Sequence, residues 1–185
     1  MSYRFRRWIL IARPPKPVRM ILNPLCTLVQ ICTLILTNIE LPATAEIGPG
    51  LYIPHTGYIV LGGRVRIGSN CTLTQGVTIG HAGGGGKSAE LNPVIGNRVY
   101  IGPSAVIIGP VAIADDALIG AGAIVISSVP SGGVVVGNPA RLVSSRGSFD
   151  LITYAGMEQD AERNLALIAI RGQPANPAVV AEVAR

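Results

Sequence analysis

The sequence predicts an all-β solenoid, a parallel β-helix built from hexapeptide repeats, with a helix before it and a short, partly helical tail after it. The first observation is composition: hydrophobic residues make up 49% of the chain, but aromatic residues only 4%. The second is the glycine content, 23 of 185 residues. The third is an aliphatic residue that recurs every six positions. A narrow core of small and branched side chains with frequent tight corners explains all three.

The six-residue period is most regular from Ile95 onward. Residues that are two positions apart on a strand point to the same face. Each hexad should therefore form a short strand with two inward side chains, followed by a corner. Three hexads complete one turn of about 18 residues, and each turn stacks on the one before. One inward position carries Ile95, Ile101, Ile107, Ile113, Ile119 and Val125, and the other carries Val99, Ala105, Val111, Ala117 and Ala123.

The same pattern begins earlier in the chain, at Ala45-x-Ile47-Gly48. It is interrupted twice: two residues are inserted around His55, and four are inserted around Gly83–Gly86. Segments that leave a solenoid are where such proteins carry function. We therefore expect a basic N-terminus with an apolar helix over 1–39 and a β-helix over 40–143 with a loop at 80–94. The tail, 144–185, should include an amphipathic helix around Met157–Ile170.

The N-terminal segment is basic and apolar. Six of the fifteen basic residues fall within the first nineteen positions: Arg4, Arg6, Arg7, Arg13, Lys16 and Arg19. The stretch Val18–Leu36 could be a signal peptide with Ala43-Thr44-Ala45 as its cleavage site, but the segment removed would be longer than usual. It could also be a membrane span, but polar residues and proline interrupt the apolar run. We expect one helix that starts near Pro24 and is packed on the domain or lies at a membrane surface. A peripheral membrane contact through residues 1–36 and a solvated terminus remain alternatives. Nucleic-acid binding is not expected.

The cysteines and histidines exclude a metal site of the usual kind. Cys26, Cys32 and Cys71 form no CxxC pair and have no metal-ligand spacing. We interpret them as structural thiols of a reduced protein, located in the cytoplasm or at the inner face of its membrane. A zinc site on a trimeric β-helix needs about three histidines, and this chain has two.

Candidate catalytic residues follow from the interruptions. His55 lies at an irregularity of the coil, where neutral imidazole can take a proton from a hydroxyl; a structural histidine is the alternative. His81 stands at the start of the glycine loop, where contact with a ligand or exposure is the better interpretation. The run Gly83–Gly86 with Lys87-Ser88 resembles a phosphate-binding loop but has His81 where that motif requires glycine. A close backbone approach to another ligand remains plausible there.

Several segments together resemble bacterial serine O-acetyltransferases and their relatives in exopolysaccharide biosynthesis. The resemblance covers roughly residues 38–143. Its residues are Gly50-Leu51-Tyr52-Ile53-Pro54-His55, Gln75–Gly80, Gly83–Lys87, Asn92–Gly96 and Gly137-Asn138-Pro139-Ala140-Arg141.

The resemblance implies a left-handed β-helix, an exception to the usual right-handed crossover, in a homotrimer with active sites between neighbouring coils. It implies His55 as general base and, at the position of the family's acidic partner fifteen residues earlier, Glu40 as the residue that orients it, with acetyl-CoA as co-substrate and no metal. The coenzyme contacts it implies fall on Gly83, Gly84, Lys87, Pro103, Ala121 and Arg141.

The departures from the family concern the acceptor. Pro54 stands where the serine enzymes have an aspartate beside the histidine. Leu91 and Asn92 replace the Arg-His pair that holds the serine carboxylate. Charged groups need partners when they leave water, so we expect Pro54, Asn92 and His81 to contact an acceptor without free serine's charges. An O-acetyltransferase acting on a sugar in exopolysaccharide biosynthesis is therefore favoured over a serine acetyltransferase, and a non-catalytic scaffold is the third hypothesis.

Overall fold

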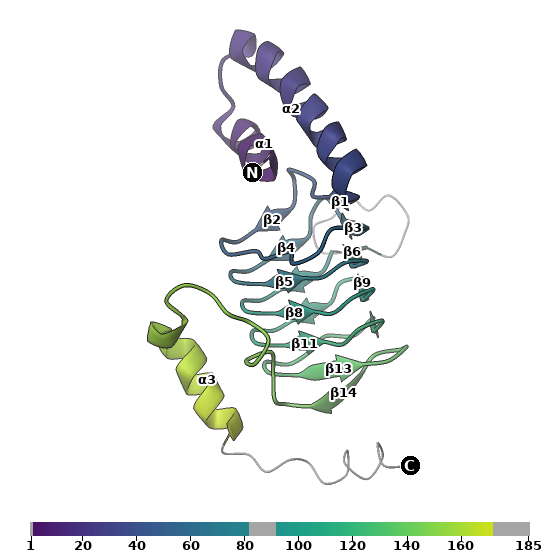
Figure 1. The fold of residues 1–185 in the computed structure, drawn as a ribbon, viewed down its shortest axis with the longest axis vertical. Coiled ribbons are helices and arrows are strands. Elements are labelled where there is room, and N and C mark those ends of the chain that lie inside the picture. Colours follow the sequence, from purple (N-terminus) through teal and green to yellow (C-terminus); the bar gives the residue numbers. More distant parts are fainter. Residues whose placement is uncertain (1, 82–91, 172–185) are drawn as a thin grey trace.

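The chain folds into a triangular coil with helices at both ends, in a computed structural model that describes residues 2–81 and 92–171 (Figure 1). Helices α1 (Ser2–Ala12) and α2 (Lys16–Thr37) lie over the N-terminal end of the coil. The 3-10 turn η2 (Met157–Gln159) and helix α3 (Ala161–Arg171) follow its last strand. The predicted parallel β-helix is present between them.

Three parallel sheets form the sides of the coil, here called faces A, B and C. Face A contains β1 (Ile39–Glu40), β3 (Ile59–Leu61), β6 (Thr78–Gly80), β9 (Val106–Ile108) and β12 (Ile124–Val125). Face B contains β2 (Glu46–Ile47), β4 (Arg66–Ile67), β7 (Val94–Ile95) and β10 (Ala112–Ile113). Face C contains β5 (Thr72–Leu73), β8 (Tyr100–Ile101), β11 (Leu118–Ile119), β13 (Val134–Val136) and β14 (Arg141–Ser144), the last of which runs antiparallel to β13.

The inward positions predicted from the repeat form the core. From Ile95 to Val125 every one of them is at most 5% exposed. The sheets keep the same register, so that Ile79 lies against Ile107 and Ile107 against Val125. Parallel stacking thus places similar side chains above one another in columns. The interior of the coil is narrow, so only small and aliphatic side chains pack there.

Helix α1, which the sequence did not predict, covers the first strand of face B. The Tyr3 hydroxyl donates to the Ala45 carbonyl at 2.7 Å and accepts from the Ile47 amide at 3.2 Å. Arg7 donates to the Ala45 carbonyl at 2.6 Å, and Arg4 to the carbonyls of Ile47 and Gly48. These bonds satisfy the outer backbone groups of β2, which have no strand above them.

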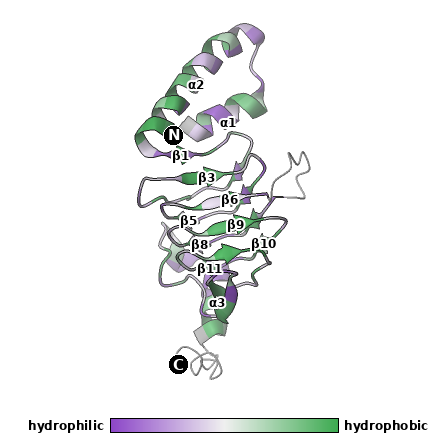
Figure 2. Ribbon diagram, turned by 90° about the vertical axis from the view of Figure 1, so that its right-hand side faces the viewer, coloured by the Kyte–Doolittle hydropathy of each residue, from purple (hydrophilic) through white to green (hydrophobic). Residues whose placement is uncertain are grey.

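Helix α2 starts at Lys16 rather than near Pro24, so that expectation was wrong. Pro17 lies in the first turn, where a missing N–H costs nothing. Pro24 is accommodated inside the helix. Length and composition make α2 the one helix in the described ranges that could cross a membrane, and Figure 2 shows it largely apolar above the coil.

The cysteines are only partly as expected. Cys26 and Cys71 are buried, whereas Cys32 is exposed on α2 and is not a packing residue. Burial raises the pKa of the Cys71 thiol to about 11, which keeps it protonated and inert at neutral pH.

The tail is held to the coil through Arg98. Its guanidinium donates to both carboxylate oxygens of Asp116, at 2.7 and 3.0 Å. It also lies 3.6 Å from Asp160 and 3.8 Å from Glu162, at the start of α3. The hydrogen bond to Asp116 raises the pKa of Arg98 above its ordinary value. The Ser148 hydroxyl completes the contact by donating to the Arg98 carbonyl at 2.6 Å.

Candidate active site

One edge of the coil, where face C turns into face A, gathers four of the predicted site residues: Pro54, His55, Pro103 and Ala121. We call it the C–A corner; it comprises residues 54–58, 74–76, 102–104, 120–122 and 137–140. Backbone bonds stack these corners: Gly76 donates to Gly57 at 2.9 Å, Ser104 to Gln75 at 2.9 Å and Gly122 to Pro103 at 2.8 Å. Residues that are about one coil apart in sequence therefore become neighbours.

His55 lies at the N-terminal end of the C–A corner and is exposed. The two inserted residues found in the sequence account for its position. The chain after His55 adopts left-handed conformations at Gly57 (φ 121°) and Tyr58 (φ 46°) before it enters β3. This wider turn carries the imidazole outside the regular line of the coil, while Pro54 before it is half-buried.

Glu40 lies on β1, the first strand of face A, and its side chain is exposed. Its strand partner is Val60 of β3, the strand into which the His55 turn leads. No hydrogen bond joins Glu40 to His55 within the described part of the chain. The two predicted catalytic residues are thus on adjoining segments, with both side chains open to solvent.

The predicted coenzyme contacts are distributed unevenly. Pro103 and Ala121 lie in the C–A corner below His55, half-buried and exposed respectively. Arg141 begins β14 at the far end of the coil and is exposed, with its guanidinium donating to the Ala140 carbonyl. Gly83, Gly84 and Lys87 lie outside the described residues, as does Leu91.

His81 and Asn92 lie at the opposite edge of face A. His81 directly follows β6, and Asn92 precedes β7. The width of face A, about 10 Å for a three-residue strand, separates this edge from the C–A corner. A single chain therefore does not bring His81 next to His55. Asn92 is 4% exposed, so its side chain is a buried one.

Two side-chain atoms near these edges are buried without a hydrogen-bond partner among the described residues. One is Nδ1 of His81 and the other is Oε1 of Gln75. Gln75 lies directly below Gly57 in the C–A corner. A buried polar atom without a partner carries a free-energy cost unless a water, an ion or another bound group completes it. The repeat pattern did not single out Gln75, because it treats corner positions as neutral.

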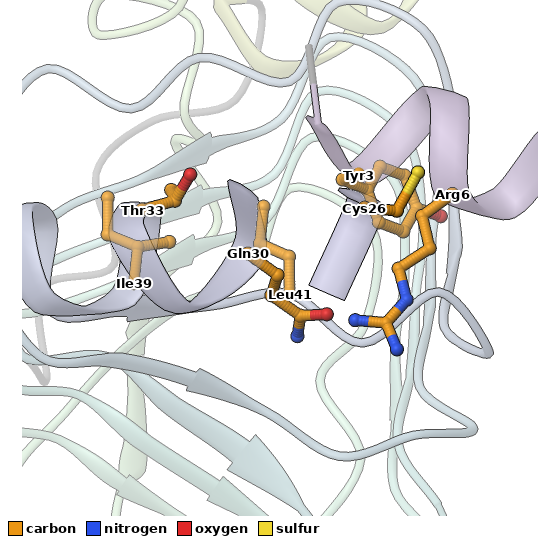
Figure 3. Close-up of a pocket in the computed structure, with 7 residues that line it drawn as sticks. All are labelled: Tyr3, Arg6, Cys26, Gln30, Thr33, Ile39 and Leu41. Carbon is orange, nitrogen blue, oxygen red and sulfur yellow. The ribbon is translucent and has the colours of Figure 1, made fainter. Parts of the chain in front are cut away.

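A small cavity lies elsewhere, between α1, α2 and the first coil (Figure 3). Its lining consists of Tyr3, Arg6, Cys26, Gln30, Thr33, Ile39 and Leu41. None of the predicted catalytic or coenzyme-binding residues is among them, and we assign it no part in the chemistry.

Comparison with known proteins agrees with the hexapeptide repeat. The family described as bacterial transferase hexapeptide (six repeats) matches residues 92–127. A serine acetyltransferase of Mycobacterium tuberculosis is 34% identical over 157 residues, which cover 80% of this chain and 68% of that protein. The chain belongs to the serine acetyltransferase family.

Further members of the serine acetyltransferase family support this placement. The enzyme of Helicobacter pylori is 38% identical over 109 residues, covering 59% of this chain and 63% of that protein. The solved serine acetyltransferase of Vibrio cholerae superposes with a TM-score of 0.63 at 28% identity, covering 77% of this chain and 51% of that one. The chain thus spans about half the length of this structural neighbour. The left-handed β-helix implied by the resemblance is confirmed.

Proposed function

We propose that this protein is an acetyl-CoA-dependent O-acetyltransferase whose active site is the C–A corner. The observation that carries the proposal is the exposed His55 on a widened turn, directly above a stack of corners that includes Pro103 and Ala121. A serine acetyltransferase of Brucella abortus, 27% identical with a TM-score of 0.63, has been solved in complex with coenzyme A. This supports acetyl-CoA as the donor.

His55 would act as the general base. Its imidazole takes the proton of the acceptor hydroxyl as the oxygen attacks the thioester carbonyl carbon. When the carbon–sulfur bond breaks, the imidazolium returns that proton to the leaving thiolate, so the proton balance closes without a metal. Glu40 would accept a hydrogen bond from the other ring nitrogen and stabilise the imidazolium. This requires its exposed side chain to turn toward the His55 corner.

The site needs a neighbouring copy of the chain. His81 lies across face A from His55, so it can approach a His55 corner only if that corner belongs to another subunit. A closed ring of copies, such as the homotrimer, would place these two edges side by side. The orphaned His81 Nδ1 would then find its partner in the acceptor or in the adjoining subunit.

L-serine is the first acceptor to test, because the relatives described above are serine acetyltransferases. This favours serine over the sugar acceptor expected from the sequence. A sugar remains the second candidate on one observation. Pro54 and buried Asn92 supply no charge for the two charged ends of free serine. Gln75 Oε1 offers an uncharged acceptor of hydrogen bonds in the same corner.

The experiment is release of free coenzyme A thiol from acetyl-CoA by the purified protein, with L-serine or a panel of nucleotide sugars. We expect turnover with serine, and His55→Asn should lower kcat by about 100-fold to 10,000-fold. Arg146→Ala, exposed after β14 and outside the C–A corner, is the control and should keep full activity. Turnover with a sugar alone would support the second candidate. Equal rates for His55→Asn and the wild type would overturn the mechanism.

A further inference from the structure

Helix α2 is amphipathic in the opposite sense to a helix packed on a soluble domain. The residues turned toward α1 and the coil are mostly polar or small: Cys26, Gln30 and Thr33 line the cavity there. The outward side is apolar and exposed, with Met20 78%, Ile21 71%, Leu25 55%, Leu28 58%, Ile31 48%, Ile35 71% and Leu36 80% accessible. A soluble helix buries its apolar stripe against its own core. No other part of the described chain covers the apolar side of α2, which is therefore open to a partner.

Helix α1 extends the apolar surface. Phe5 and Trp8 stack with ring centroids 5.8 Å apart, and both are about half exposed. Leu10 and Ile11 are 48% and 66% exposed. Tryptophan is enriched where an apolar phase meets water, because its ring is apolar and its N–H is polar. We call the exposed apolar residues of α1 and α2 together the N-terminal apolar surface.

The charges around this surface indicate which partner covers it. Arg13, Lys16 and Arg19 are exposed where α1 passes into α2, and no acidic residue precedes Glu40 in the sequence. A second copy of the same helices would bring equal positive charges together. Anionic lipid headgroups would neutralise these charges, and each cation near the surface raises the affinity for the bilayer about fivefold. Charge complementarity thus favours an anionic bilayer over self-association.

The attachment of α1 determines how α2 can meet a bilayer. Arg7 is bonded to the first coil, and only five helical residues and a short connection lie between it and Lys16. These reach about 21 Å at most, whereas α2 is about 33 Å long and the hydrocarbon core is about 30 Å thick. While α1 remains bound, Lys16 cannot reach the far side of a membrane. The helix must lie along the surface.

We propose that the N-terminal apolar surface docks in the plane of an anionic lipid bilayer, with the first coil of the β-helix facing the membrane. The apolar side chains enter the headgroup–acyl boundary, and Arg13, Lys16 and Arg19 contact the lipid phosphates. His55 lies in the first coil, so its corner is held beside the lipid surface. This inference does not depend on which acceptor is acetylated.

The test is co-sedimentation of the full-length protein with vesicles of phosphatidylcholine alone or with about one third phosphatidylglycerol. We expect at least about tenfold stronger binding to the anionic vesicles, weakened by salt. Because Trp8 is the one tryptophan of the chain, its emission should shift to shorter wavelength on binding. The double substitution Ile21→Asp/Ile35→Asp should abolish both effects. Leu165→Asp, 69% exposed on α3, is the matched control and should leave both unchanged.

Charge is tested separately by Arg13→Gln/Lys16→Gln/Arg19→Gln, which should remove the preference for anionic vesicles. The circular dichroism of the β-helix and the acetyl-CoA assay show that the variants are folded. No binding by the wild type, or equal binding by Ile21→Asp/Ile35→Asp, would overturn the proposal. If instead the wild type forms an oligomer, does not bind vesicles, and becomes monomeric in the double variant, the surface is an interface between copies of the chain. Resistance of bound protein to alkaline carbonate would show a spanning helix and overturn the in-plane geometry.

Discussion

Removing the Arg98 side chain should destabilise the protein strongly, because it would leave buried negative charge without a partner. The side chain of Asp116 is 3% exposed and accepts two hydrogen bonds from Arg98. Removing one partner of a buried ion pair lowers the free energy of unfolding by about 3–5 kcal/mol. Domains have a total free energy of unfolding of about 5–15 kcal/mol. Arg98→Ala should therefore lose a large fraction of the stability of the coil.

The assay is urea unfolding followed by circular dichroism. Arg146→Ala is the matched control, since Arg146 is exposed and surface substitutions change stability by about 0.5 kcal/mol or less. Asp116→Asn should cost less than Arg98→Ala, because asparagine keeps an acceptor oxygen and tolerates the left-handed backbone of this position (φ 61°). An unfolding midpoint for Arg98→Ala equal to that of Arg146→Ala would refute this reasoning.

Three further changes test other parts of the fold. Tyr3→Phe removes the hydroxyl that bonds the first coil and should cost about 1 kcal/mol in urea unfolding; no change would show that α1 does not cap the coil. Exposed Cys32 should react with a maleimide in the native protein, while buried Cys71, with its pKa near 11, should react only after denaturation; mass spectrometry distinguishes the two. The Tyr154 hydroxyl holds the pKa of Asp160 below its ordinary value of 3.8. Asp160 thus stabilises the tail fully above that pH and loses its effect as pH falls through the lower folded value, which amide exchange in α3 should detect; protection independent of pH would contradict it.

The coil was predictable from sequence because its side-chain requirement is strictly local. Every hexad repeats the same pair of inward positions, so the pattern alone locates the strands. Cys71 occupies one of these inward positions and could be assigned to the core for that reason. Helix α1 could not be predicted in this way. It forms because Tyr3, Arg4 and Arg7 bond the open backbone of β2, and that backbone lies some forty residues away.

The candidate site was predictable to the extent that it interrupts the repeat. The insertion around His55 singled out that histidine. The family resemblance supplied Pro103 and Ala121, which the stacking of the corners places below it. Gln75 was missed because its orphaned oxygen arises from the packing of one corner on another. The separation of His81 from His55 was overlooked, although four hexads lie between Ile53 and Ile79, one more than a full turn, which puts the two histidines at different corners.

Each end of the coil has one strand that is closed to a further parallel strand, β2 at the start and β13 at the finish. At one end Tyr3 and Arg7 occupy the carbonyl groups of the first coil. At the other, β14 runs antiparallel to β13, a direction that the repeat cannot continue. A parallel β-helix has its unpaired strand edges at its ends, and open edges of this kind let molecules join into fibres. End-to-end joining of copies into a fibre through these two strands is therefore blocked.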